Sequence, residues 1–151
     1  MVAIEQLKEL REKTGLSLNE CRTALLEAGG DISRAQEILR ARGNAFADKK
    51  QDRTLGAGTI SAYVHATKQI GTIVELDSES DFVSKNEEFQ KLAYDLAMHV
   101  SATNPESVEK LLTEPYVKDN AKTVQAFIEE YVQKFGEKIK IARFSRFMVL
   151  R

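Results

Sequence analysis

The apolar residues change their period within residues 71–100, which read GTIVELDSESDFVSKNEEFQKLAYDLAMHV. Val74 and Leu76 alternate with charged neighbours, which is typical of a half-buried strand. From Phe89 onward the apolar residues fall instead at i, i+3, i+4, i+7 and i+11, the spacing of an amphipathic helix, and Asn86 stands where that helix needs a cap. A strand that leads through an acidic loop into a helix therefore indicates a core that mixes α and β elements.

The residues on either side of this stretch complete an α+β pattern. Alternation at Ile60, Ala62 and Val64 predicts a partner strand, in a hairpin that closes near residues 68–71. Farther on, the spacing predicts a short helical piece around residues 108–112, a helix from Val124 that stops at Gly136, and a long strand over residues 138–150. Residues 59–151 are therefore predicted to form an α+β core, a three-stranded antiparallel sheet with helices packed on one side.

The first 43 residues read as three short helices, each with one apolar stripe. Ser17 begins the sequence Ser-Leu-Asn-Glu, a capping box in which the hydroxyl and the Glu20 carboxylate cap the helix reciprocally. Asp31 is the expected N-cap of the third helix. Each helix is predicted to stop at a glycine, at Gly15, Gly29–Gly30 and Gly43. Residues 1–43 are thus predicted to form a three-helix head, whose small core suits docking better than catalysis, and residues 44–58 a partly helical linker.

The charge balance and the single cysteine exclude several classes of protein. Lys and Arg number 22 against 23 Asp and Glu, so no net charge favours nucleic acid or an anionic membrane. Cys21 cannot form a disulfide within the chain, which indicates a reducing compartment. The start of the chain has no signal-peptide pattern, and no run approaches the ~18 apolar residues that cross a bilayer. We therefore expect a soluble cytoplasmic protein that binds no membrane.

The acidic loop resembles a calcium-binding loop in its spacing but lacks a residue that such a loop needs. The ligand positions 1, 3, 5 and 12 would be filled by Asp77, Glu79, Asp81 and Glu88. Phe82, however, occupies the sixth position, where the sharp turn requires glycine, and a strand precedes the loop in place of a helix. We therefore predict no metal in this loop.

The other reactive side chains have no partners at catalytic or ligand spacing. Cys21 lies on the apolar stripe of its helix, as a small buried residue does. His65 and His99 are far apart in sequence, and neither has Cys or carboxylate neighbours at the spacing of a zinc site or a triad. The chain also lacks the glycine-rich motifs that bind phosphates. We therefore predict no catalytic residue, no metal and no cofactor, and a chain that is not an enzyme.

Phe82 is the unusual residue of the acidic loop, and it has two interpretations. It could pack under the loop as part of the core, as most phenylalanines do. It could instead be an exposed aromatic wedge beside the Asp81 carboxylate, the kind of side chain that dominates a protein interface. The spacing of the sequence leaves both interpretations open.

The tail mixes basic and aromatic side chains: Lys134, Lys138, Lys140, Arg143, Phe144, Arg146, Phe147 and Arg151. Such a mixture could bind RNA through phosphate contacts and base stacking. It is also common on a solvated strand whose cations protect its edge from aggregation, and we prefer this second interpretation.

The same tail indicates self-association. On a regular strand, one face would carry Ile139, Ile141, Phe147 and Val149, and the other Ala142, Phe144, Met148 and Leu150. Both faces would then be apolar, although the predicted helices can cover only one face of the sheet. A monomer rarely leaves so large an apolar face in water. We therefore predict a homodimer that joins through the core about a twofold axis.

Several motifs, in the same order along nearly the whole chain, resemble the elongation factor Ts family. The family's N-terminal signature is similar to Leu10–Gly15, Cys21, Ala24–Leu25, Gly30–Asp31, Ala35 and Leu39–Arg40. Its second signature is similar to Tyr63, His65, Glu75–Leu76 and Asp81–Phe89, and its closing strand to Glu137–Phe147. The chain departs from the usual family residues at Asp77, Ser80, Arg22 and Leu18–Asn19, and its length has room for a single core unit.

The resemblance implies a fold, an activity and a set of contacts. It implies a ubiquitin-associated-like head, an α+β core and guanine nucleotide exchange on elongation factor Tu, which it would bind both with GDP and without nucleotide. It implies that Asp81 and Phe82, followed by Val83, push into the partner's G domain near its magnesium site. The head would grip the same domain, and the residues that this points to are Leu18, Asn19 and Arg22. Two other functions stay open, a protein-binding adaptor without exchange activity and a small RNA-binding protein.

Overall fold

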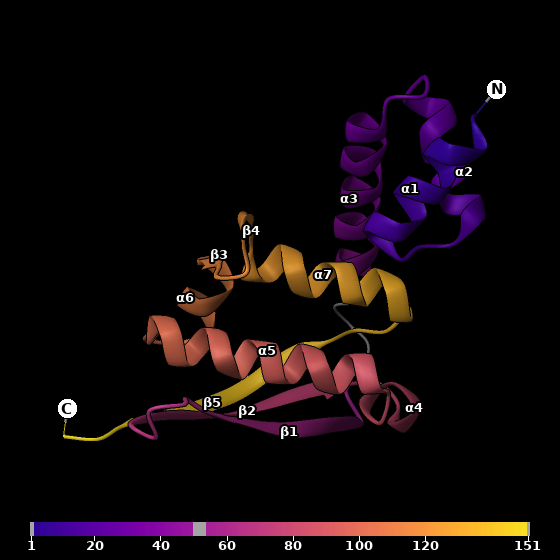
Figure 1. Ribbon diagram of the computed structural model, residues 1–151. Coiled ribbons are helices and arrows are strands. Elements are labelled where there is room, and N and C mark those ends of the chain that lie inside the picture. The colour runs from indigo at the N-terminus through magenta and orange to yellow at the C-terminus, as the bar shows by residue number, and fades with distance from the viewer. Residues whose placement is uncertain (1, 50–53, 151) are drawn as a thin grey trace. The chain divides into compact units, whose positions relative to one another are not determined.

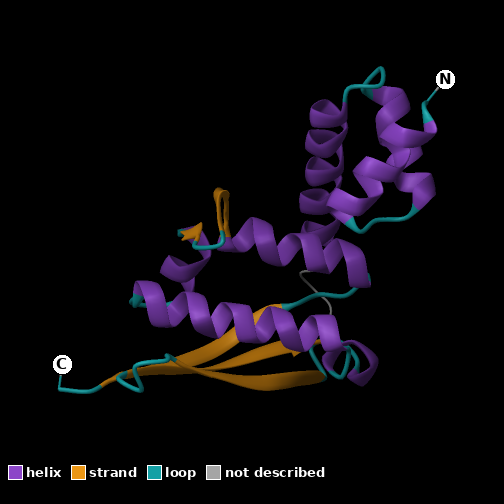
Figure 2. Cartoon of the chain, in the orientation of Figure 1, coloured by secondary structure: helices purple, strands orange, loops and turns teal. Residues whose placement is uncertain are grey.

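Two units of different class make up the chain. The computed structural model describes residues 2–49 and 54–150, and the chain divides into its two units after Lys49. Figure 2 shows helices alone in the first unit, and a main three-stranded sheet with helices in the second. The predicted fold class, helices followed by an α+β core with a three-stranded antiparallel sheet, is therefore confirmed.

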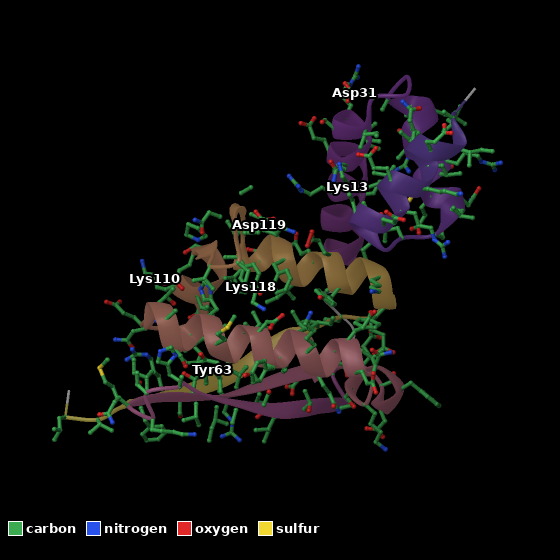
Figure 3. All side chains as sticks on the ribbon, viewed as in Figure 1. Lys13, Asp31, Tyr63, Lys110, Lys118 and Asp119 are labelled. Carbon is green, nitrogen blue, oxygen red and sulfur yellow. The ribbon has the colours of Figure 1, made fainter. Side chains whose placement is uncertain are left out.

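The N-terminal unit consists of α1 (Ile4–Thr14), α2 (Leu18–Glu27) and α3 (Ile32–Lys49), shown in Figure 1. The predicted capping box is present, because the Ser17 hydroxyl accepts from Glu20 N while the Glu20 carboxylate accepts from Ser17 N. Asp31, labelled in Figure 3, caps α3 by accepting a hydrogen bond from Arg34 N. The apolar stripes meet in one small core of Leu10, Leu16, Cys21, Ala24, Leu25, Ala28, Ala35 and Leu39.

The third helix does not end at Gly43, and that prediction is wrong. α3 continues to Lys49, and Gly43 is buried within it. A glycine ends a helix when its backbone adopts the left-handed conformation, as Gly15 does with φ 70°. Gly43 is absent from the residues with positive φ, so the helix passes through it. The segment expected as a linker is thus helical over residues 44–49 and extended from Ala57, where the first strand begins.

The main sheet of the second unit has the strand order β1-β2-β5. β1 (Ala57–Val64) and β2 (Ile70–Ser78) form the predicted antiparallel hairpin, and β5 (Lys140–Met148) pairs antiparallel with the other edge of β2. Val74 and Leu76 on the central strand are fully buried, as their alternation predicts.

Helices cover one face of this sheet (Figure 1). α5 (Glu87–Thr103) packs along the sheet with its apolar stripe from Phe89 to Val100 completely buried. α7 (Val124–Phe135) packs on α5, where Phe135 meets Phe89 edge to face with ring centroids 6.3 Å apart. No described helix of this unit packs on the other face of the sheet, as was predicted.

A second, two-stranded sheet lies between the short α6 (Val108–Thr113) and α7, and the sequence pattern does not predict it. It consists of β3 (Pro115–Tyr116) and β4 (Asp119–Thr123), which carry too few apolar residues to alternate. Buried His99 on α5 holds it, since its Nδ1 accepts from Val117 N at 3.2 Å and its Nε2 lies 2.9 Å from Glu114 Oε1. Figure 3 shows Lys118 of the same hairpin, whose ammonium lies 3.0 Å from Asp95 on α5.

A β-bulge in β5 overturns the predicted assignment of its faces. Leu76 pairs with Ile141 and Glu75 with Arg143, so the strand carries an extra residue at this point. The extra residue reverses the alternation, because side chains on a strand change face at every step. Ile141 and Phe144 therefore face the helices together, whereas Phe147 lies on the uncovered face and is 67% exposed.

Among the described residues, no helix is both long enough and apolar enough to span a membrane.

Candidate partner-binding site

The acidic loop carries a helix of a single turn, α4 (Asp81–Ser84), between β2 and α5. Ser80 is its N-cap, and the Ser80 hydroxyl accepts from Val83 N at 3.4 Å. Successive residues of a helix point about 100° apart. Val83 and Ser84 accordingly point inward and are buried, while Asp81 and Phe82 point to solvent.

Phe82 is 92% exposed, so it is not part of the core. This excludes the interpretation in which it packs under the loop. Its neighbour Val83 is only 8% exposed, and the Val83 side chain therefore anchors the helix instead of presenting a contact surface. Of the three consecutive residues expected at the partner, the structure thus presents two, an acidic and an aromatic side chain next to each other.

The loop before α4 is fastened to the segment that joins α7 to β5. The Glu137 carboxylate accepts from Glu79 N at 3.1 Å, from Ser80 N at 2.9 Å and from the Ser80 hydroxyl at 2.5 Å. In return, the Glu79 carboxylate accepts from Lys138 N. Sequence reasoning missed Glu137, because it lies 57 residues from Ser80 and no periodic pattern joins the two.

The predicted residues of the N-terminal unit lie on the exposed side of α2. Leu18 is 47% exposed at the start of the helix, and the side-chain Oδ1 of Asn19 accepts from the Arg22 guanidinium at 3.1 Å. Leu26, which was not predicted, is 57% exposed on the same side, two turns beyond Leu18. The spacing of Leu18, Arg22 and Leu26 at i, i+4 and i+8 could have revealed this second stripe.

The uncovered face of the main sheet is an apolar surface. Its exposed apolar residues come from all three strands: Ile60 (66%) and Val64 (58%) on β1, Ile73 (48%) on β2 and Phe147 (67%) on β5. They surround a shallow hollow that includes Ile60, Ile73 and Phe147 together with Glu75 and Arg143. We call the uncovered face that carries Ile60, Val64, Ile73 and Phe147 the open face.

Two neighbouring carboxyl groups of β2 lie at one end of the open face, and their proton affinities differ. Burial, followed by the hydrogen bond and the charge of Glu75, raises the pKa of Asp77 to about 6. The hydrogen bond from Asp77 and that from the Arg143 guanidinium lower the pKa of Glu75. Gly58 faces Asp77 in the strand register, and a Cβ at Gly58 would lie 2.5 Å from Asp77 Oδ1. The missing side chain therefore makes room for this carboxyl group.

The cysteine and the histidines of the described residues lie apart from one another. Cys21 is buried in the core of the N-terminal unit. His65 is exposed, and a hydrogen bond of 3.0 Å joins its Nδ1 to the Tyr63 hydroxyl. His99 holds the β3–β4 hairpin. Within residues 2–49 and 54–150 no three His, Cys, Asp or Glu side chains converge as ligands would.

Known proteins resemble this chain over almost its full length. The family model described as "Elongation factor TS" matches residues 79–150. The protein named elongation factor Ts from Acetivibrio thermocellus is 36% identical, over 97% of this chain and 89% of its own. The protein of the same name from Thermosipho melanesiensis is 37% identical, over 99% of each chain.

The alignments also show where this chain differs from its relatives. They extend over 192 positions with the first relative and 194 with the second, whereas this chain has 151 residues. At least 41 of the 192 aligned positions are therefore gaps in this chain, so the relative has residues there that this chain lacks. The match nevertheless includes the acidic loop, the exposed aromatic residue and the closing strand. This chain belongs to the elongation factor Ts family.

Proposed function

We propose that this protein binds elongation factor Tu, with GDP or without nucleotide, and accelerates the release of GDP. The observation that carries the proposal is Phe82, which is 92% exposed beside Asp81 on a one-turn helix. Exposed aromatic residues are among the strongest contributors to protein interfaces. The family membership supports elongation factor Tu as the partner, since relatives bear the name elongation factor Ts.

The mechanism makes and breaks no covalent bond and uses no cofactor. Phe82 enters the G domain of the partner near the magnesium site, and the Asp81 carboxylate displaces groups that hold Mg²⁺ and the phosphates. Because binding free energies are reciprocal, a protein that binds the nucleotide-free partner more tightly must weaken the binding of nucleotide. A ~10⁴-fold faster release corresponds to about 5.5 kcal/mol of such preference, if association is unchanged.

The N-terminal unit grips the same G domain through α2. Leu18, Asn19 and Arg22 are the proposed contacts, and exposed Leu26 extends them along the helix. A grip of this kind determines how tightly the partner is held, whereas Asp81 and Phe82 determine how strongly its nucleotide site is disturbed. The two sets of residues are therefore expected to affect different parameters of the exchange reaction.

The protein acts in the cytoplasm as a homodimer, and the open face joins the two copies. Ile60, Val64, Ile73 and Phe147 are exposed together on this face, from 48% to 67% each. A twofold axis that lies between the two sheets would bring this patch against the same patch of the second copy. Two copies joined in this way would place two α+β cores in one assembly.

Release of labelled GDP from a bacterial elongation factor Tu tests the proposal. We expect micromolar amounts of the protein to accelerate the release at saturating magnesium, and the protein alone to leave GTP intact. A salt-dependent affinity for RNA with no effect on GDP would support the RNA-binding alternative. Binding to elongation factor Tu with an unchanged release rate would support the adaptor.

A further inference from the structure

One glutamate outside the acidic loop accepts three of the hydrogen bonds that shape the loop. Glu137 Oε1 accepts from Glu79 N and Ser80 N, at 3.1 and 2.9 Å, and Oε2 accepts from the Ser80 hydroxyl at 2.5 Å. Ser80 is in turn the N-cap of α4. The carboxylate therefore holds the residue from which the helix with Asp81 and Phe82 begins.

We infer that Glu137 is a positioning residue for nucleotide exchange, which fixes the direction in which Asp81 and Phe82 point. The inference rests on the proposed function. α4 has only four residues, and a single helical turn is unstable by itself, because ordering the first turn costs more than its hydrogen bonds return. Its direction must therefore come from attachments to the rest of the unit, which include buried Val83 and Ser84 and the Ser80–Glu137 contact.

The segment that carries Glu137 is itself firmly attached. It follows directly on Gly136, which ends α7 in the left-handed conformation with φ 73°. The last turn of α7 meets α5 twice, through an ion pair between Lys134 and Glu88 and through the ring contact of Phe135 with Phe89. Figure 1 shows α4 and this end of α7 at the same end of the sheet. Glu137 thus connects a single helical turn to the end of a longer, packed helix.

The contact matters for exchange because a side chain that displaces groups of its partner must resist being displaced. If α4 could turn about its attachment, binding would move Phe82 aside and leave the partner's nucleotide site undisturbed. Misplacing a functional group by about 1 Å can cost on the order of 10²-fold in rate. Affinity depends less on this direction, because the N-terminal unit supplies contacts of its own.

The pattern of hydrogen bonds predicts which substitutions the site tolerates. Both backbone N–H groups point to Oε1, and a glutamine keeps an oxygen at this place. Oε2 meets only the Ser80 hydroxyl, which can rotate and accept from an amide NH₂ instead. Glu137→Gln should therefore preserve the position of the loop, whereas Glu137→Ala removes all three acceptors. A role that depends on the negative charge would instead be lost in both variants.

The first experiment measures stimulated GDP release from elongation factor Tu over a range of protein concentrations. We expect Glu137→Ala to lower the maximal rate about 10-fold, while the half-saturating concentration changes less than about 3-fold, and Glu137→Gln to recover most of the rate. Glu130→Ala is the matched control, because Glu130 is an exposed carboxylate of α7 that pairs with Lys122. An unchanged maximal rate in Glu137→Ala, or equal losses in the alanine and glutamine variants, would overturn the inference.

The second experiment needs no partner and so separates this inference from the proposed function. The chain contains no tryptophan, so Phe82→Trp places a single fluorophore on α4. We expect the nanosecond anisotropy decay of this residue to gain a large fast component when Glu137 is alanine, and none when it is glutamine. If Glu137→Ala fails to fold, Glu137→Asp takes its place, since a carboxylate that is one methylene shorter cannot keep all three contacts and should give a smaller change in the same direction. Identical decays in all variants would overturn the positioning role, whereas a parent protein without exchange activity would overturn only the proposed function.

Discussion

Phe82 and Phe89 are seven residues apart and have opposite surroundings. The first is 92% exposed and the second is fully buried. We expect Phe82→Ala to remove about 2–4 kcal/mol of interaction with elongation factor Tu in the state from which GDP leaves, the range of interface hot spots, and so to lower the maximal release rate with little change in the melting temperature. The measurements are a titration of labelled GDP release and a thermal unfolding curve.

Phe89→Ala is the control for this comparison, because the same atoms are removed from the core. It should reduce the free energy of unfolding by about 3–5 kcal/mol. If Phe82→Ala lowered the melting temperature as much as Phe89→Ala does, Phe82 would be a core residue in solution. The interpretation of Phe82 as an exposed contact for the partner would then be wrong.

Asp77 should make the stability of the protein depend on pH. Because its pKa is raised to about 6 in the folded chain from an ordinary value of 3.8, the folded state binds this proton more tightly than the unfolded state does. The free energy of unfolding that this proton contributes is therefore lost as the pH rises from about 4 to 6. Above about pH 6 Asp77 causes no further change. Solvent screening reduces the effect to about 1 kcal/mol or less.

The test is Asp77→Asn, which keeps a hydrogen-bond donor toward Glu75 and removes the titration. Urea unfolding at pH 5 and pH 7.5 should show that the parent loses stability between these values and that the variant loses less. Glu75 should contribute with the opposite sign, because the hydrogen bonds of Asp77 and Arg143 lower its pKa in the folded chain. The same pH dependence in both proteins would assign the titration to another group.

At the residue scale, the sequence predicts chemistry better than exposure. The pairing of an acidic with an aromatic residue at Asp81 and Phe82 is visible in the sequence, but whether Phe82 is buried is decided by the direction of a single helical turn. That direction depends on Glu137, 57 residues from Ser80, and hydrogen bonds between side chain and distant backbone leave no periodic signal. The capping residues Ser17, Asp31 and Asn86 are predictable because their partners lie within three residues.

At the element scale, the period of the apolar residues predicts the helices and strands. The predictions fail where the backbone conformation at a single residue differs from the expected one. Gly43 leaves α3 uninterrupted because it keeps the helical conformation. The bulge in β5 moves Phe147 to the open face, although the sequence around it alternates regularly. A bulge depends on pairing with a neighbouring strand, in this case Glu75 and Leu76 of β2, so one strand read alone does not reveal it.

The division into units predicts that residues 54–151 fold without the N-terminal helices. These helices have their own core, from Leu10 to Leu39, and the sheet buries its apolar residues against α5. We expect the fragment to unfold cooperatively in urea, because it keeps its own core. We also expect it to lose at least about 10-fold in stimulated GDP release, because the contacts of α2 are gone. Full activity of the fragment would show that α2 does not hold the partner.

At the scale of the whole molecule, the open face is the feature that a monomer leaves unexplained. The relative from Acetivibrio thermocellus has residues at 41 or more aligned positions where this chain has none. Burying apolar surface contributes roughly 25 cal/mol per Å², and exposed apolar patches of this kind commonly mark interfaces. A second copy supplies a matching patch without any further sequence.

We therefore expect sedimentation equilibrium to give about twice the chain mass of 17.0 kDa over most of the range from below 1 µM to ~100 µM. Ile73→Glu, at the centre of the open face, should shift the equilibrium toward the monomer, and Phe147→Glu should do the same. Val117→Glu is the control, since Val117 is 41% exposed but lies in the β3–β4 hairpin, away from the sheet. If the dimer interface buries Asp77, the two copies should also bind each other more tightly at pH 5 than at pH 7.5. The reason is that an ionised carboxylate resists burial. A monomer at the highest concentration, with both glutamate variants unchanged, would show that the open face is not the surface that joins two copies.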